Sequence, residues 1–261
     1  MDKHTVGGIS HFIKEIGRGS DGARALDSAQ AQQLMGAVLD RSVSDLEIGA
    51  FAIAMRMKGE TLEELEGFLA AAHERCLRVA SQRPVLVLPS YNGARRLPNL
   101  APLLALRLAQ QGEQVLMHGP LRDPRRVSSA DVLQALGIAP ARTQAEIDAC
   151  WARREPAFVP IDTLCPPLAW LLDVRWTIGV RSSGHTIVKM LNPVAGAPSL
   201  RIGSYTHPEF GELLAAHARA SAADLMLLRG TEGEAVADAR RQPRIDTFLH
   251  GLLRPELSCP A

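Results

Sequence analysis

The sequence has few cysteines and no long apolar run, and each shortage excludes a class of protein. Its four cysteines (Cys76, Cys150, Cys165 and Cys259) are scattered over 261 residues with no Cys-X-X-Cys pair, which excludes a disulfide framework and a zinc knuckle. No N-terminal stretch joins a charged start to an apolar segment, and no window approaches 18 consecutive apolar residues. We therefore expect a cytoplasmic protein with no membrane partner.

Lysine is also scarce, since 25 of the 29 basic residues are arginine. A genome rich in G and C accounts for part of that ratio but not for where the arginines lie. The chain carries a net charge of +1, yet residues 1–74 are net −5, residues 75–126 are net +7, and the remainder is net −1. Because arginine makes bidentate contacts with phosphate and carboxylate, the basic block is a candidate anion-binding region.

The remaining composition is that of a folded protein. Hydrophobic residues make up 46% of the chain and charged residues 22%, which excludes wholesale disorder. A chain of this length forms one large domain or two small ones and buries a substantial core.

The first 80 residues have the apolar spacing of helices. Residues 9–16 fit one helix, and caps at residues 27–28 and 44–45 open two more. Residues 46–55 are apolar on most faces, so this third helix is expected either to be buried on several sides or to pack against a partner chain. Thr-Leu-Glu-Glu at residues 61–64 has the form of a capping box and opens a fourth helix.

From about residue 84 the pattern is that of a parallel sheet. Residues 85–88 form an unbroken apolar run, typical of a strand buried on both faces, and residues 114–119 repeat it after a helix expected at about 99–110. Ligands of such sheets bind beyond the carboxyl ends of the strands. Further strands are expected at residues 157–160, 200–204 and 223–228, with a helical stretch at 167–190 between them.

Two loops at that edge have features of an anion-binding site. The loop of residues 90–98 has Gly93 for a tight turn and lies where phosphate cradles form, although it matches neither a Walker loop nor a GxGxxG motif. The loop of residues 119–129 leaves the second strand at the same edge. Their cations are Arg95, Arg96, Arg122, Arg125 and Arg126, and the first loop adds the polar residues Ser90, Asn92 and Asn99. The open alternatives are a plain strand-to-helix turn and a solvated arginine face.

Catalytic constellations are sparse. His118 precedes a glycine at a strand end, but no base or nucleophile accompanies it at a fixed spacing. His185 fits the start of a helix as well as it fits a catalytic role. Glu232 and Glu234 flank a glycine and either hold a divalent cation or are simply solvated. Without a nucleophile–base–acid set, the pattern points to binding and not to turnover.

The order of these segments resembles the superfamily of anthranilate phosphoribosyltransferases and pyrimidine nucleoside phosphorylases (glycosyltransferase family 3). The matching segments are residues 58–61 (Lys-Gly-Glu-Thr), 85–110, 118–119 (His-Gly), 178–181 (Ile-Gly-Val-Arg), 191–193 (Leu-Asn-Pro), 205–209 (Tyr-Thr-His-Pro-Glu) and 230–234. The resemblance implies an α/β fold: a small helical domain at 1–80, joined by an inserted helical segment at about 166–192, and a larger α/β domain at 81–261 with a mainly parallel sheet. It also implies a homodimer paired through the N-terminal helices, and an α/β domain that is short at its C-terminal end.

The sequence departs from the active members of that superfamily at their donor site. Their Gly-Thr-Gly-Gly-Asp loop is replaced by Pro-Ser-Tyr-Asn-Gly at 89–93, and their Lys-His-Gly-Asn-Arg loop by Met-His-Gly-Pro-Leu-Arg at 117–122. Lost glycines hinder the close approach of a diphosphate, and the lost lysine removes a positive charge. The resemblance thus implies a degenerate donor-site loop (Ser90, Asn92, Gly93, Asn99, His118 and Gly119) and a degenerate magnesium position (Glu232 and Glu234).

Residues 90–95 (Ser-Tyr-Asn-Gly-Ala-Arg) and 165–168 (Cys-Pro-Pro-Leu) are similar to the YbiB-like branch, whose members are known as sequence-nonspecific DNA-binding proteins. The branch implies a protein that is not an enzyme, needs no metal or cofactor, and binds the DNA backbone through aligned cations. Those cations would be Arg95, Arg96, Arg122, Arg125, Arg126, Arg181 and Lys189. Two alternatives stay open: a transferase that uses phosphoribosyl pyrophosphate and magnesium, and a sensor that binds a phosphorylated metabolite without converting it.

Overall fold

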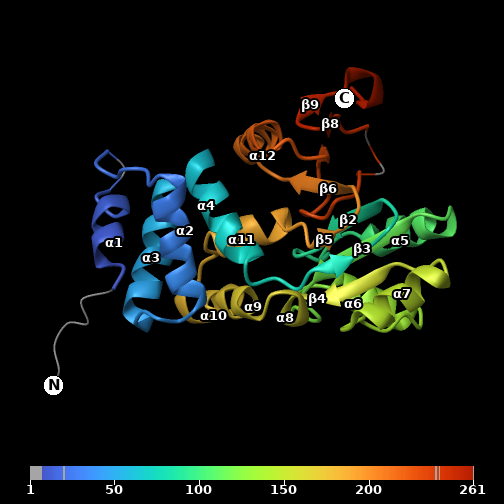
Figure 1. Cartoon of the computed structure of the whole chain (residues 1–261), viewed down its shortest axis with the longest axis horizontal. Coiled ribbons are helices and arrows are strands. Elements are labelled where there is room, and N and C mark those ends of the chain that lie inside the picture. The colour runs from blue at the N-terminus through green and yellow to red at the C-terminus, as the bar shows by residue number, and fades with distance from the viewer. Residues whose placement is uncertain (1–7, 20, 239, 241, 261) are drawn as a thin grey trace. The chain divides into compact units, whose positions relative to one another are not determined.

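The chain forms two compact units (Figure 1). The computed structural model describes residues 8–19, 21–238, 240 and 242–260. The helical unit comprises Met1–Cys76 and Cys165–Leu191, and the α/β unit comprises Leu77–Leu164 and Asn192–Ala261. The family resemblance implied the corresponding boundaries at residue 80 and at about 166–192.

The helical unit begins with four helices, each of which the apolar spacing predicted. The unit contains α1 (Ser10–Ile16), α2 (Ser28–Leu39), α3 (Asp45–Lys58), α4 (Leu62–His73), α9 (Pro166–Asp173), α10 (Arg175–Ile178), α11 (Gly184–Ile187) and the short 3-10 helix η1 (Val188–Met190). Asp27, Ser44 and Thr61 each cap a helix in a full capping box, so all three predicted caps are confirmed. The continuous helical stretch expected at 167–190 is instead broken, because the chain turns at Gly179 with a φ of +79°.

A buried ion pair joins three parts of the helical unit. The carboxylate of Glu64 accepts from Lys58 Nζ at 2.6 Å, from the backbone N–H of Leu26 at 3.0 Å and from that of Thr61 at 2.9 Å. The Glu64 side chain is fully buried and that of Lys58 is only 9% exposed. Glu64 therefore bonds at once to the cap of its own helix, to the lysine at the end of α3 and to the backbone that leads into α2.

The α/β unit contains a seven-stranded sheet in the order β4-β3-β2-β6-β7-β8-β9. Its strands are β2 (Val85–Pro89), β3 (Gln114–Gly119), β4 (Ala157–Pro160), β6 (Ser199–Tyr205), β7 (Leu225–Arg229), β8 (Ile245–Leu249) and β9 (Leu252–Leu253), and a separate pair joins β1 (Val79–Ala80) to β5 (Val194–Ala195). The first five strands in this order (β4, β3, β2, β6 and β7) are parallel to one another, which confirms the predicted mainly parallel sheet. The antiparallel strands β8 and β9 were not predicted.

The helices of the α/β unit follow these strands along the chain. They are α5 (Ala101–Gln110), α6 (Ser129–Ala135), α7 (Gln144–Ala152), α8 (Ile161–Leu164), α12 (Pro208–Ala220) and the 3-10 helix η2 (Pro255–Leu257). A hydrophobic core formed by β2, β3, β4 and the apolar faces of α5 and α6 includes Leu88, Ala105, Met117 and Phe158. No helix among the described residues is long and apolar enough to cross a membrane.

The strand order reverses beside β2, and this reversal positions the candidate site. From β2 the chain proceeds to β3 and β4 on one side, whereas β6 and β7 lie on the other side. At such a switch point the loops that leave neighbouring strands diverge and open a crevice at the carboxyl edge of the sheet. The loops after β2, β3 and β7 all leave from that edge.

We expect Glu64→Ala to lower the free energy of unfolding by about 3–5 kcal/mol, because it leaves the Lys58 ammonium buried without its counter-charge. Urea denaturation measures this loss. The matched control is Glu63→Ala, at an exposed position of the same helix turn, which should cost no more than about 1 kcal/mol. Equal losses in the two variants would contradict the role assigned to Glu64.

Candidate functional site

The two arginine-bearing loops are hydrogen-bonded to each other. Ala94 in the loop after β2 and Val127 in the loop after β3 exchange both backbone hydrogen bonds, at 3.0 and 2.9 Å. The pairing fixes Arg95 and Arg96 beside the loop that carries the other three arginines. The structure thereby confirms the expectation that these loops adjoin at one sheet edge.

The arginine side chains of the paired loops remain available to solvent. Arg95, Arg96, Arg122 and Arg125 are exposed, and Arg126 is half-buried with Nη1 donating to the carbonyl of Gly93 at 3.4 Å. No ion pair joins any of these five to a carboxylate within the part of the chain that the structure describes. The other two predicted cations, Arg181 and Lys189, belong to the helical unit.

Glu234 is buried against the loop after β2. Its Oε1 atom accepts from the backbone N–H groups of Asn92 at 2.8 Å and Gly93 at 2.6 Å, and the residue is only 2% exposed. The interpretation of this turn as a solvated acidic segment is therefore wrong for Glu234. The carboxylate sits where backbone amides of a phosphate cradle would meet an anion.

Glu232 extends the same arrangement further along the loop. Its carboxylate accepts from the N–H groups of Arg95 at 2.7 Å, Arg96 at 3.1 Å and Leu97 at 3.4 Å. The pKa of Glu232 is held below its ordinary value, mainly by the N–H of Arg95 and to a lesser extent by those of Arg96 and Leu97. Partial burial opposes this lowering. Two glutamates thus accept from five amides of one loop.

Two glycines permit this close approach of the turns. A Cβ atom on Gly233, where φ is +89°, would collide with the side-chain amide of Asn92. A Cβ atom on Gly119 would collide with the carbonyl oxygen of Ser90. Substitution of Gly233 must push apart the two loops that the glutamates join, and substitution of Gly119 must push the ends of β2 and β3 apart.

The polar side chains expected to face a ligand are engaged inside the unit. Ser90 and Asn99 are buried; Ser90 Oγ shares a 2.7 Å hydrogen bond with Ser129 Oγ, and Asn99 Nδ2 donates to the Val127 carbonyl at 3.2 Å. His118 is fully buried, with Nδ1 2.6 Å from Tyr91 Oη. These residues hold the loops together and do not form a binding surface.

His185, the other histidine considered for catalysis, lies at the start of α11 in the helical unit. Burial, together with the charges of Arg181, Arg175 and Lys189, lowers its pKa to about 3. The imidazole is therefore neutral at neutral pH, and its Nδ1 accepts from the N–H of Ser182 at 3.3 Å. Of the two roles predicted for it, the helix-start role fits this environment.

A diphosphate and its magnesium ion do not fit the residues present at the carboxyl edge. The amides of residues 92, 93 and 95–97 that would cradle a diphosphate already donate to Glu232 and Glu234, and an incoming anion must displace both carboxylates. The same hydrogen bonds occupy both oxygens of Glu232 and Oε1 of Glu234, which leaves the buried Oε2 of Glu234 as their one oxygen without a hydrogen-bond partner among the described residues. No cluster of three or more His, Cys, Asp or Glu side chains with metal-site geometry occurs in the described residues.

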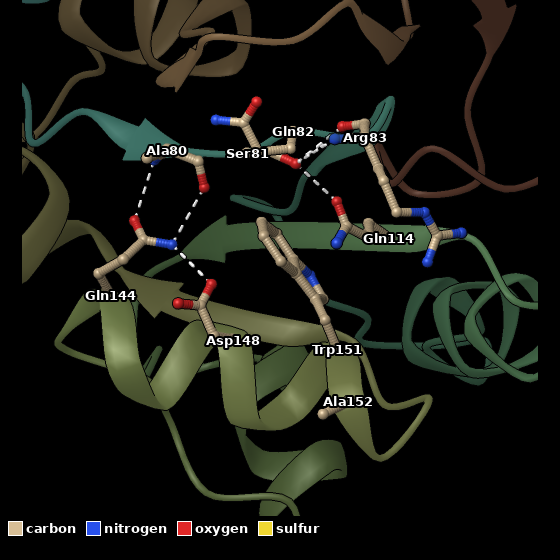
Figure 2. A pocket seen from close by; sticks show the side chains of 9 residues that line it. All are labelled: Ala80, Ser81, Gln82, Arg83, Gln114, Gln144, Asp148, Trp151 and Ala152. Carbon is tan, nitrogen blue, oxygen red and sulfur yellow. Dashed lines mark hydrogen bonds between the residues drawn. The ribbon is translucent and has the colours of Figure 1, made fainter.

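A pocket of about 490 Å³ lies at the opposite, amino edge of the sheet (Figure 2). Gln144 from α7 binds both the N–H and the carbonyl of Ala80, at 2.9 and 3.0 Å, and Trp151 Nε1 donates to the Val115 carbonyl at 3.0 Å. Ser81 likewise donates to Gln114. The pocket's polar groups thus tie the chain before β2 to α7 and β3, a structural role that sequence reasoning did not anticipate.

We expect Glu234→Ala to lower the free energy of unfolding by about 1–3 kcal/mol, because it strands the buried N–H groups of Asn92 and Gly93. Chemical denaturation of the two alanine variants compares this loss with that of Glu232→Ala, which should be smaller because water reaches the amides of residues 95–97.

The pH dependence of the free energy of unfolding gives a second check, on Glu232. Since its folded pKa is lowered, Glu232 contributes stability above pH 4.5 that is lost as pH falls through the folded pKa. The stability difference between wild type and Glu232→Gln should therefore shrink below pH 4.5, and a difference that grows there would contradict the assignment.

Proteins with similar sequences include an uncharacterized protein and anthranilate phosphoribosyltransferases. Over 238 residues the chain is 39% identical to the uncharacterized protein YbiB of Escherichia coli K12, an alignment that covers 90% of this chain and 74% of YbiB. It is 32% identical over 213 residues to the anthranilate phosphoribosyltransferase of Anaeromyxobacter dehalogenans, covering 80% of this chain and 62% of that enzyme. The chain thus spans less than two thirds of the length of that transferase.

Solved structures of anthranilate phosphoribosyltransferases have a similar fold, and a family model matches the N-terminal helices. The anthranilate phosphoribosyltransferase of Thermus thermophilus superposes with a TM-score of 0.71 at 23% identity, covering 90% of this chain and 70% of that one. The Saccharomyces cerevisiae enzyme in complex with PRPP and Mg gives 0.69 at 13% identity, covering 91% and 69%. Residues 10–76 match the helical bundle domain of a glycosyl transferase family. The chain belongs to the family of anthranilate phosphoribosyltransferase-like proteins that includes YbiB.

Proposed function

We propose that this protein binds DNA without sequence preference, through contacts of arginine side chains with the phosphate backbone, and that its scaffold no longer transfers phosphoribosyl groups. The observation that carries the proposal is the pair of hydrogen-bonded loops whose five arginines form no ion pair with a carboxylate of the described residues. Phosphate contacts of this kind supply affinity without reading bases.

The arrangement of the glutamates favours side-chain contacts over a backbone cradle. Glu232 and Glu234 satisfy the loop amides, so a phosphate that approaches this edge meets guanidinium groups first. Guanidinium forks on adjacent loops suit a row of separated phosphates better than a single small anion. This favours a polyanion over a phosphorylated metabolite.

We expect Arg95→Ala combined with Arg96→Ala to weaken binding about equally for unrelated duplex sequences. The slope of log affinity against log salt should become shallower by about 0.9 for each phosphate that the variant no longer neutralises. Fluorescence anisotropy of a labelled random duplex, titrated at low and at near-physiological salt, measures both quantities.

The matched control removes two exposed arginines from the amino edge of the sheet, Arg107→Ala with Arg154→Ala. This variant has the same net charge as the loop variant. If both variants lose the same affinity, net charge and not the loop pair governs binding. If folded wild type binds no duplex at low salt, the proposal fails.

The second candidate function is phosphoribosyl transfer, and the transferase relatives and the fold favour it. Because the loop amides are already occupied, we expect no magnesium-dependent release of pyrophosphate from phosphoribosyl pyrophosphate, with anthranilate or with a panel of other amines and bases. Release above background with any acceptor would overturn the first proposal's claim of a non-catalytic scaffold.

A thermal shift with phosphoribosyl pyrophosphate but none with DNA would favour the metabolite sensor.

We also propose that two copies of the chain pair through α3. The helix buries Ile48, Phe51, Ala52 and Met55 on one face, so the expectation that it is buried on several sides within its own chain is wrong. On another face it leaves Leu46 84%, Ile53 44% and Met57 77% exposed. Because these three residues are spaced by seven and then four positions, they form one apolar stripe along the helix. The stripe can pack against the same stripe of a second copy.

We expect Leu46→Glu with Met57→Glu to convert a dimer to a monomer in analytical ultracentrifugation, without changing the helical circular dichroism signal. The control is Leu103→Glu with Leu136→Glu, two exposed leucines of the α/β unit, which should leave the dimer intact. A monomeric wild type, or a stripe variant that stays dimeric, would contradict the pairing.

A further inference from the structure

Cys76 and Cys165 are 89 positions apart in the sequence and adjacent in the structure. We propose that this pair is a modification site: the two thiols form a reversible disulfide when the protein meets a small disulfide of the glutathione type. The inference is independent of the DNA-binding proposal, since neither cysteine belongs to the arginine loops.

Backbone hydrogen bonding holds the two cysteines together. The N–H of Leu77 donates to the carbonyl oxygen of Leu164 at 2.7 Å, so the peptide group that follows Cys76 contacts the peptide group that precedes Cys165. The Cys76 thiol is near enough to act on the pKa of Cys165, whose Sγ donates to the Ala72 carbonyl oxygen at 3.7 Å. Thiols brought together by a fixed backbone in this way need only small side-chain rotations to reach disulfide geometry.

The environments of the two thiols assign different roles to them. Cys76 is half-buried and Cys165 is fully buried, so a soluble disulfide meets Cys76 first. The Cys76 thiol, the N–H of Leu168 and the charge of Arg75 lower the pKa of Cys165, although burial acts in the opposite direction. A cysteine with a lowered pKa supplies thiolate readily and suits the resolving step.

The other two cysteines lack this arrangement. Burial raises the pKa of Cys150, and its sulfur contacts an Arg153 guanidinium at 3.7 Å. Cys259 is half-buried beside the side-chain amide of Gln242. Neither lies against another thiol among the described residues. Cys259 therefore provides a control with similar exposure to Cys76 and no resolving partner.

The reaction with oxidised glutathione balances in two exchanges. The Cys76 thiolate attacks one glutathione sulfur, the S–S bond breaks, and one glutathione thiolate leaves. The Cys165 thiolate then attacks the Cys76 sulfur and displaces the second glutathione thiolate. The two protons released by the protein cysteines are taken up by the two leaving thiolates, so the protein is oxidised by two electrons and glutathione disulfide is reduced to two thiols.

A Cys76–Cys165 disulfide would join the two chain segments that form the helical unit. Cys76 is the last residue of the helical unit's first segment, and Cys165 is the first residue of its second segment. The disulfide therefore encloses residues 77–164, which include β1 to β4. Cross-linking a loop of that length restricts the unfolded chain, so the oxidised protein should unfold at higher urea concentration than the reduced protein.

The test incubates the folded, reduced full chain with oxidised glutathione, blocks the remaining thiols, and measures intact mass and disulfide-linked peptides. We expect a product lighter by two hydrogen atoms that links Cys76 to Cys165, has a higher urea midpoint and reverts with dithiothreitol. Formation should be slower in urea-unfolded chain, where the thiols are no longer held together. Wild type that keeps both thiols, or that ends as a stable glutathione adduct at Cys76, would overturn the proposal.

Variants distinguish the two roles. Cys165→Ser should stop at the glutathione adduct on Cys76, because the resolving thiolate is absent. Cys76→Ser, a change at a half-buried position that the fold tolerates more easily, should form neither the adduct at residue 76 nor the internal bond. Cys259→Ser should form the internal bond at the wild-type rate. A cross-link that persists in Cys76→Ser, or that requires Cys259, would refute the pairing.

Discussion

The hydrogen bonds between two glutamates and the backbone of one loop govern the carboxyl edge of the sheet. Glu232 and Glu234 follow β7, and their carboxylates accept from amides of residues 92–97, about 140 positions earlier in the chain. Each carboxylate acts as an internal anion in a nest of N–H groups. The loop after β2 is thereby fixed, and the loop after β3 is fixed in turn through its backbone pairing with Ala94. Because the amides already have a charged acceptor, they gain nothing from a second one, and the guanidinium groups are left to meet any incoming anion.

Local patterns predicted the parts of the fold that local physics determines. The apolar run at residues 85–88 and its repeat at 114–119 indicated buried parallel strands because such strands are apolar on both faces. The cap residues predicted two helix starts to within one residue, and the Thr61 capping box predicted that of α4. Strand β8 escaped prediction because it is antiparallel and near the sheet edge: its sequence Ile-Asp-Thr-Phe-Leu mixes polar and apolar residues, and Thr247 is buried with Oγ1 donating to the Leu257 carbonyl. Strand β9 is exposed on both residues and carries no pattern at all.

Contacts between distant segments were beyond the sequence for a different reason. A Glu-Gly-Glu turn looks the same whether its carboxylates meet a cation, water or a remote loop, and only the folded switch point decides among these. Cys76 and Cys165 likewise looked unrelated until the fold brought the peptide groups beside them together.

The charge balance at the carboxyl edge limits how strongly it can attract a polyanion. Five arginines on the paired loops face three carboxylates at the same edge, those of Asp123, Glu232 and Glu234, and the charge of Arg126 acts on Glu232. The local surplus is therefore far smaller than the net +7 of residues 75–126 suggests. Since affinity for a phosphate backbone scales with the number of phosphates neutralised, one such edge supports a few contacts and a shallow salt dependence.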